Sequence, residues 1–197
     1  MENESQRHRL ERCQTEVEEH PGRASAHYNL GLAYTVSGRV KKAEETYLKA
    51  LEIDPRMFQA WVNLGGVRLM RWEFQGCLEA NQEAAKLRDD LPIVHYNMGQ
   101  AYLYLNDPEN VVRCNERVIE LARDHGAAHY HAAVGCLALG NLGAAERYLG
   151  RAIELGHQPT QDFMKAVEKA QRKKAQQQNV TLIEISGAET PDNTKED

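Results

Sequence analysis

The stretch HYNLGLAY, His27 to Tyr34, recurs along the chain at a constant spacing. Thirty-four residues later the sequence reads WVNLGGVR (61–68), then HYNMGQAY (95–102), then HYHAAVGC (129–136). No insertion or deletion interrupts this step. Self-similarity at a fixed period of this size is typical of repeat proteins, in which each unit packs mainly against its neighbours. The sequence therefore predicts one continuous array rather than a domain built around a single central core.

Each unit of the array is predicted to be a helix, a short turn and a second helix. We number each unit from 1 to 34, and the four units begin at Ala24, Phe58, Pro92 and Gly126. Position 8 is small in every unit, being Gly31, Gly65, Gly99 and Ala133. A small side chain at a fixed site allows two helices to approach closely. Turn-forming pairs follow at positions 14–17, among them Ser37-Gly38, Asp107-Pro108 and Gly140-Asn141.

The repeated motif resembles that of the tetratricopeptide repeat (TPR) family, W-x2-L-G-x2-Y followed by A-x3-F and P. The first unit matches it at His27, Leu30, Gly31, Tyr34, Ala43, Tyr47 and Pro55. The second unit departs from it at Arg68, Asn81 and Asp89. The resemblance covers four units, at 24–57, 58–91, 92–125 and 126–159. It implies an all-α fold, a right-handed α-solenoid of helix-turn-helix TPR units.

Both ends of the chain extend the repeat. Residues 1–23 are predicted to hold the second helix of an incomplete unit, Glu4 to Glu19, with Leu10, Cys13 and Val17 as its apolar stripe. Residues 160–178 are predicted to form a C-terminal capping helix, since Phe163 continues the period and the other face is polar. Residues 179–197 are predicted to be a disordered acidic tail.

Composition limits the classes of function. A formal net charge of −5 with mixed signs gives no electrostatic basis for binding nucleic acid or an anionic membrane surface. The N-terminus lacks the apolar core of a signal peptide, and no apolar run reaches the roughly 18 residues of a membrane span. The four cysteines lie far apart, which favours reduced thiols. We therefore expect a soluble, cytoplasmic protein.

One face of the first helices is uncharged. An α-helix turns about 100° per residue, so positions 2, 6, 9 and 13 share a face. None of the residues at these positions is Lys, Arg, Asp or Glu. We call this surface the inner face, because the TPR resemblance implies that it lines the concave side of the superhelix, where such families commonly bind peptides. An uncharged patch rimmed by polar groups is also typical of partner-binding surfaces.

The predicted peptide-binding residues lie on or beside the inner face. Position 6 carries a ladder of Asn29, Asn63 and Asn97, with His131 ending the row. Packed helices are roughly 8–10 Å apart, and an extended chain rises about 3.3 Å per residue, so one amide could meet a bound peptide at about every third residue. The ladder is similar to the one in the TPR superhelix of the protein O-GlcNAc transferase. The other candidates are Tyr28, Tyr96, Tyr130, Met70, Gln100 and Tyr104.

The ladder has a second interpretation, in which its amides bond only to the neighbouring unit and hold the array together. The binding hypothesis predicts that replacing Asn63 and Asn97 with alanine abolishes partner capture without changing thermal melting. Trp72 also has two interpretations, because it occupies a position where a turn-forming residue is usual. It could pack against Phe74 or the next unit, or it could anchor a partner.

Several other kinds of site are not supported. A chaperone-type C-terminal carboxylate clamp needs cations where this chain has Tyr28, Ile93 and Asn97, and an asparagine where it has Leu32. His125 and His129 are four residues apart, but His129 takes the core position of Trp61, so we expect no metal. Cys77 and Cys136 fall at interior positions, which favours packing over catalysis. We expect no cofactor and no catalytic residues.

The function predicted from sequence is a non-catalytic scaffold that binds a partner protein or peptide in the concave groove. One alternative is a self-assembling, homo-oligomeric TPR adaptor. Another is a small secretion-type chaperone for an unstable client protein. A further possibility is that Val180 to Ile185 folds back along the groove as an internal ligand.

Overall fold

The computed structural model describes the backbone of residues 4–186 and the side chains of residues 5–177. The described part is entirely helical and contains no strand. Its ten helices are α1 (Glu4–Glu19), α2 (Ala24–Val36), α3 (Val40–Ile53), α4 (Phe58–Met70), α5 (Phe74–Leu87), α6 (Pro92–Tyr104), α7 (Pro108–Leu121), α8 (Gly126–Ala138), α9 (Leu142–Glu154) and α10 (Gln161–Ser186).

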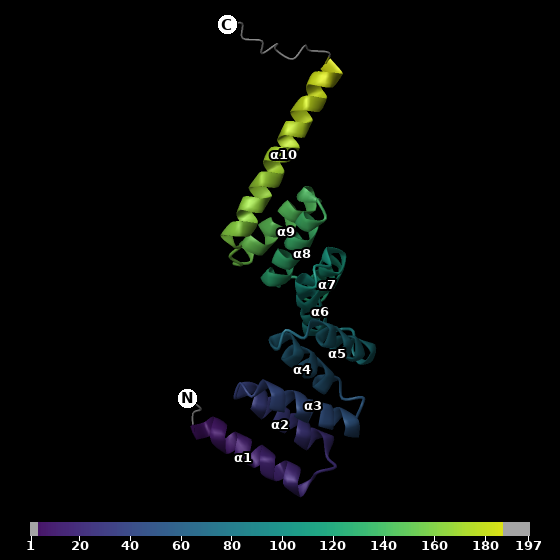
Figure 1. The fold of residues 1–197 in the computed structure, drawn as a ribbon, viewed down its shortest axis with the longest axis vertical. Helices are drawn as coiled ribbons and strands as arrows, with labels where there is room; N and C mark the ends of the chain where they lie inside the picture. The colour runs from purple at the N-terminus through teal and green to yellow at the C-terminus, as the bar shows by residue number, and fades with distance from the viewer. Residues whose placement is uncertain (1–3, 187–197) are drawn as a thin grey trace.

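The helices stack in chain order into an elongated array (Figure 1). Each of the four predicted units contains one helix-turn-helix pair: α2–α3, α4–α5, α6–α7 and α8–α9. Every helix packs against the next one along the chain, and the first helices of successive units also touch, α4 with α6 and α6 with α8. The predicted all-α solenoid of repeats is therefore confirmed.

The turn inside each unit uses the same backbone conformation. Position 15 is Gly38, Trp72, Asn106 and Gly140, and the φ angles of these residues are +69°, +64°, +56° and +75°. The left-handed conformation reverses the chain between two helices, and glycine and asparagine adopt it most easily. In the third unit Asp107 then caps α7, because its side chain accepts a hydrogen bond from the Asn110 backbone N–H at 3.1 Å.

A ring at position 4 ties each unit to the turn before it. Trp61 Nε1 donates to the carbonyl of Pro55 at 2.9 Å, six residues earlier. The Nε2 atoms of His27, His95 and His129 lie 2.8, 3.0 and 3.0 Å from the equivalent carbonyls. A carbonyl only accepts, so each histidine must carry its proton on Nε2. This shared bond explains why histidine and tryptophan exchange at position 4.

The small residue at position 8 makes room for position 24 of the same unit. A Cβ added to Gly31 would lie 2.5 Å from the Tyr47 ring. The same addition at Gly65 or Gly99 would lie 2.0 Å from the amide nitrogen of Asn81 or 2.7 Å from that of Asn115. Position 24 therefore inserts directly against the first helix, and in the second and third units it places a fully buried amide there.

An ion pair accounts for Arg68, which replaces the usual tyrosine of the motif. Its Nε lies 3.0 Å from Glu44 Oε1 on α3, and Arg71 pairs with the other carboxylate oxygen. Both the Glu44 and Arg68 side chains are mostly buried. The contact joins the first and second units with a charged pair.

The terminal helix differs from the sequence prediction. Phe163 and Val167 pack against α8 and α9 in a cluster with Ala133 and Leu149, as a capping helix requires. The helix was expected to end near residue 178, with a disordered tail over 179–197, but α10 continues to Ser186. No glycine or proline interrupts the sequence before Gly187, so nothing local stops the helix. The expectation for 187–197 lies outside the described residues.

The proposal that Val180 to Ile185 lies in the groove is also not what the structure shows. These residues belong to α10, which leads away from the rest of the array (Figure 1). None of the helices within residues 4–186 is long and apolar enough to cross a membrane.

Candidate functional site

A pocket of about 430 Å³ opens where the C-terminal ends of α4 and α6 meet α8. It is lined by Leu69, Met70, Trp72, Phe74, Gln100, Leu103, Tyr104 and His131. Met70, Gln100, Tyr104 and His131 are residues that the sequence places on the inner face, and the structure brings them together here. We call this site the aromatic pocket.

Three aromatic rings form one wall of the aromatic pocket. The rings of Phe74 and Tyr104 stack nearly parallel, with centroids 4.6 Å apart and an interplanar angle of 6°. Trp72 meets both rings edge-on, at 5.1 Å from Tyr104 and 5.9 Å from Phe74. Trp72 is nevertheless 68% exposed. It therefore combines the two alternatives from the sequence, since it contacts its neighbours and still presents most of its surface to solvent.

The backbone of Trp72 is in an unfavourable conformation. Its φ of +64° belongs to the left-handed region, which is uncommon for any residue except glycine and a clear outlier for a bulky one. The equivalent positions of the other units hold glycine or asparagine. Such strain costs on the order of 1–3 kcal/mol and is concentrated at functional sites. The chain thus keeps a large exposed ring at a position where a glycine would fit the turn better.

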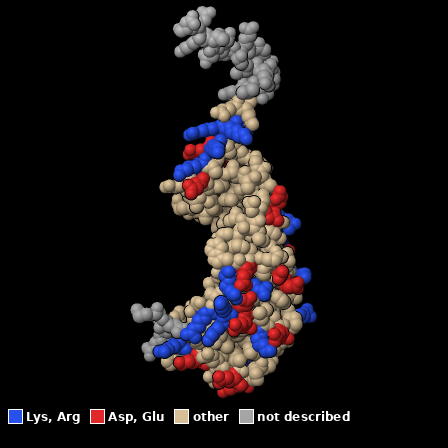
Figure 2. Space-filling model, in the orientation of Figure 1, with Lys and Arg blue, Asp and Glu red and all other residues tan. Residues whose placement is uncertain are grey.

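The lining of the aromatic pocket contains no Lys, Arg, Asp or Glu. Met70 and Tyr104 are 57% and 55% exposed, respectively. Figure 2 shows Lys, Arg, Asp and Glu gathered over the N-terminal part of the stack and over α10. The middle of the stack is nearly free of them on this face, and the stack is hollowed there. Isolated exposed apolar residues are normal, but a contiguous group around a pocket indicates an interaction site.

The asparagine ladder is not uniform. Asn29 is half-buried and makes no side-chain hydrogen bond among the described residues. Asn63 Nδ2 donates to the Gln59 carbonyl at 2.8 Å and to the Tyr28 hydroxyl at 3.3 Å. The side-chain oxygen of Asn63, Oδ1, accepts no hydrogen bond among the described residues. The first two rungs therefore keep some hydrogen-bonding capacity for a ligand.

Asn97 is held inside the array instead. It is only 6% exposed, and its Nδ2 donates to Asn81 Oδ1 on α5 at 3.3 Å. Asn81 in turn donates to the Cys77 carbonyl at 2.9 Å. Removing the Asn97 amide would leave the buried Asn81 Oδ1 without its donor, so we now expect the double variant Asn63→Ala with Asn97→Ala to melt at a lower temperature than wild type. The contacts of Asn97 thus agree with the second interpretation of the ladder, in which an amide bonds to the neighbouring unit and holds the array together.

The next junction repeats this geometry without the hydrogen bond. Asn115 occupies the position of Asn81, and His131 occupies that of Asn97. Asn115 Nδ2 donates to the Val111 carbonyl at 2.8 Å, but Asn115 Oδ1 and His131 Nδ1 are both buried and unpaired. Asn81 and Asn115 are absent from the sequence-based site. In the sequence, Asn81 and Asn115 are marked only by their departure from the TPR motif at position 24.

His131 is kept neutral by its surroundings. Burial lowers its pKa to about 4, with smaller contributions from the positive charges that His157 and His125 can carry. Its ring stacks on Tyr96 with centroids 5.5 Å apart and an interplanar angle of 11°. A neutral imidazole leaves this side of the aromatic pocket without a charge at physiological pH.

The three position-5 tyrosines line the inner face but also pack within it. Tyr28 lies 6.0 Å from the Tyr47 ring, and Tyr130 lies 5.2 Å from the Phe163 ring of α10. Burial raises the pKa of Tyr96. All three rings are half-buried, so each can offer only part of its surface to a ligand.

Among the described residues, no group of three His, Cys, Asp or Glu side chains could hold a metal ion. All four cysteines are free and buried, and burial raises the pKa of Cys77 and of Cys114 to about 11. A thiol with a raised pKa is a weak nucleophile at neutral pH.

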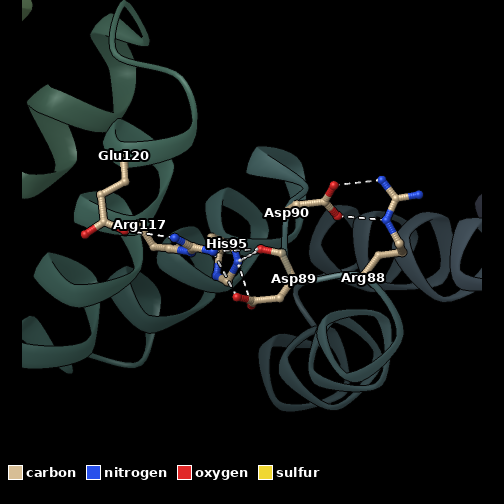
Figure 3. A network of polar contacts seen from close by, with 6 residues as sticks. All are labelled: Arg88, Asp89, Asp90, His95, Arg117 and Glu120. Atoms are coloured by element: carbon tan, nitrogen blue, oxygen red, sulfur yellow. Dashed lines mark hydrogen bonds and ion pairs between the residues drawn. The ribbon is translucent and has the colours of Figure 1, made fainter.

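A second pocket of about 610 Å³ lies between α5, α6 and α7, and the sequence analysis did not predict it. Its lining includes Met98 and Tyr102, which point away from the inner face of α6. Figure 3 shows the polar network at its edge, in which Asp89 contacts both His95 and Arg117. Asp89 Oδ1 lies 3.1 Å from His95 Nε2, and Asp89 Oδ2 lies 3.0 Å from the Arg117 guanidinium. These contacts fix the turn between the second and third units, because Asp89 pairs with the Arg117 guanidinium and lies within hydrogen-bonding distance of His95 Nε2.

Two family models described as tetratricopeptide repeat match this chain, over residues 24–57 and 96–159. The matches contain the first unit and nearly all of the third and fourth, and the structure adds the same helix pair for the second. The chain belongs to the tetratricopeptide repeat family. The TPR pattern therefore accounts for the whole array from α2 to α9.

Solved TPR proteins share this fold. The crystal structure of MamA gives a TM-score of 0.72 at 20% identity and covers 75% of this chain and 86% of that chain. A fragment described as MamA 41-end from Desulfovibrio magneticus RS-1 gives 0.73 at 18% identity, over 78% and 86%. YrrB, described as a TPR protein with an unusual peptide-binding site, gives 0.69 at 21% identity, over 85% and 84%. At these identities the similarity shows the fold alone.

Among curated proteins, the human protein O-mannosyl-transferase TMTC3 is 26% identical over 153 residues. The match covers 68% of this chain but only 16% of that protein. The similarity is therefore to a small part of the transferase.

Proposed function

We propose that this TPR protein is a non-catalytic scaffold that holds an extended segment of a partner protein along its inner face. An apolar side chain of the segment would occupy the aromatic pocket. The observation that carries this proposal is Trp72, an exposed ring held in a left-handed turn at the rim of the pocket. Tryptophan is among the residues that most often dominate binding energy at interfaces.

The polar residues of the inner face support an extended ligand. Asn29 keeps its whole amide and Asn63 keeps its Oδ1 acceptor, and these groups can pair with a peptide backbone whatever the ligand's side chains are. Gln100 lies in the aromatic pocket itself. Asn97 would act indirectly, because its bond to Asn81 fixes the position of α6 against α5. The proposed binding residues are therefore Asn29, Asn63, Gln100 and the pocket lining.

Charge indicates which segments fit. The inner face carries no Lys or Arg that could pair with a terminal carboxylate, and His131 is neutral. A charged side chain would lose its hydration in the pocket without gaining a partner. The bound part of the segment should therefore be uncharged.

Selection from an unbiased peptide library tests the proposal. The library is panned separately on the wild-type chain, on Trp72→Gly and on Ile153→Ala. Trp72→Gly empties the rim of the pocket and suits the left-handed turn, whereas Ile153→Ala removes an exposed apolar side chain of α9, outside the pocket lining. We expect wild type and Ile153→Ala to enrich the same uncharged peptides and Trp72→Gly to lose them. Equal enrichment by all three, or none by the wild type, would contradict the proposal.

Self-association is the second candidate. Large apolar residues are exposed in every unit near the end of the first helix, namely Val36, Met70, Trp72, Tyr104, Leu105 and Leu139. A second copy could cover this row. Light scattering after size exclusion distinguishes the two functions, since a strict monomer at high concentration excludes self-association as the use of this surface.

A further inference from the structure

The spacing of the first helices limits the conformation of a ligand that crosses them. Helix α6 touches both α4 and α8 directly, so neighbouring axes lie roughly 8–10 Å apart. Contacts across the α6–α8 step are direct, as the stacking of Tyr96 on His131 shows. A segment that crosses the inner face therefore meets the same helix position of the next unit once every 8–10 Å or so.

A β-strand does not match this spacing. Its side chains alternate between two faces, so residues on the same face are about 6.6 Å apart, and residues three apart point in opposite directions. A polyproline II helix has three residues per turn and rises about 3.1 Å per residue, so every third side chain faces the same way after about 9.3 Å. Only the second geometry presents the same side of the ligand to each unit.

The aromatic pocket suits the side chains of such a helix. Polyproline II segments dock into grooves lined by aromatic rings, where flat pyrrolidine rings pack on ring faces. Trp72, Phe74 and Tyr104 provide three adjoining rings, and two of the three are more than half exposed. The neutral surroundings match a proline-rich segment, which needs no counter-charge.

The hydrogen-bonding groups at the rim of the aromatic pocket also match. A polyproline II helix has no internal hydrogen bonds, and proline has no N–H, so the ligand presents carbonyl acceptors almost exclusively. The indole N–H of Trp72 can only donate, and it makes no hydrogen bond among the described residues. The Gln100 amide beside it adds a second possible donor. A donor at the rim of an aromatic groove is suited to a ligand of this kind.

From these four matches we infer that the partner segment is a proline-rich polyproline II helix with an apolar or proline residue at every third position. This inference rests on the proposed function and specifies the ligand class for the same site. The segment would cross α4, α6 and α8 in turn and place one residue in the aromatic pocket.

Two synthetic peptides of equal length and charge test the inference. One consists of repeated Pro-Pro-Leu units, and the other replaces the prolines with threonine and valine, which favour strands. Binding is measured by the anisotropy of a terminal fluorophore. We expect the proline peptide to bind at least about tenfold more tightly than the strand-forming peptide. We also expect about tenfold weaker binding to Trp72→Gly and to Tyr104→Ala, and no change for Ile153→Ala.

The outcomes separate the two proposals. Equal or tighter binding of the strand-forming peptide, lost in Trp72→Gly, would overturn the polyproline inference and leave the groove as a binding site. Binding of the proline peptide that survives both pocket variants would overturn the assignment to this pocket. If neither peptide binds, the polyproline inference is overturned, and the library selection then decides the proposed function independently.

Discussion

Replacing Asn81 or Asn115 with leucine makes the same chemical change at the same position of two successive units. Both side chains are fully buried against a glycine of the first helix, and leucine branches at Cγ as asparagine does. The two amide oxygens differ in their partners. Asn81 Oδ1 accepts a hydrogen bond from Asn97, whereas Asn115 Oδ1 has no partner among the described residues. The same substitution should therefore change stability in opposite directions.

The magnitudes follow from the cost of an unpaired buried group. Asn81→Leu leaves the amide of Asn97 without its acceptor at a 6% exposed site, which should cost about 1–3 kcal/mol. Asn115→Leu removes an oxygen that is already unpaired, and should stabilise the array by about 1 kcal/mol. For a chain of this size 1 kcal/mol shifts the melting temperature by about 2–4 °C. The two variants should thus melt on the order of 10 °C apart.

Thermal and urea unfolding followed by circular dichroism at 222 nm measure this difference. The double variant Asn81→Leu with Asn97→Leu is the control, because it removes both partners and should recover most of the lost stability. If both single variants lower the melting temperature equally, then Asn115 Oδ1 is not unpaired in the folded protein. The reasoning from buried amides is then wrong.

Three further predictions concern single side chains. Trp72→Gly relieves about 1–2 kcal/mol of backbone strain and loses roughly 2 kcal/mol of apolar contact, so its melting temperature should stay within a few degrees of wild type. A large drop in melting temperature would show that the Trp72 ring is mainly structural. His131→Gln should reduce the loss of stability on acidification, because the folded pKa of His131, about 4, lies below the unfolded value of about 6.5. The wild type should therefore lose up to about 2 kcal/mol of unfolding free energy as the pH falls from 7 to 5. Urea titrations that give the same loss for His131→Gln and wild type would refute this. Glu44→Gln should destabilise the junction of α3 and α4 by about 1–3 kcal/mol, because it leaves Arg68 mostly buried and without its counter-charge, and adding Arg68→Met should restore part of the loss.

Much of the fold could be predicted because its determinants are local and repeat. The constant step from His27 to His129, the small residues at position 8 and the turns at position 15 each report on structure within one unit. The length of α10 could not be predicted in this way, since the sequence between residues 178 and 186 contains neither a helix stop nor a strong helix signal.

The site was harder to predict because it depends on the register between units. The pattern places Asn97 on the inner face, but the amide that captures it comes from Asn81, sixteen residues earlier on another helix. The aromatic pocket likewise includes Phe74, at the start of a second helix, which no pattern on the first helices indicates. The unusual residue at a turn, Trp72, was the clearest local sign of the pocket.

The central claim is that a partner segment binds across Trp72 on the inner face. The chain has two tryptophans, and their indole N–H signals can be resolved in a two-dimensional ¹H–¹⁵N spectrum of the labelled protein. Trp61 Nε1 is bonded to the Pro55 carbonyl, whereas the Trp72 ring is 68% exposed at the pocket rim. Titration with the tightest peptide from the library selection should shift the Trp72 indole signal progressively and leave that of Trp61 nearly unchanged. A bound peptide that leaves the Trp72 signal in place would contradict the claim.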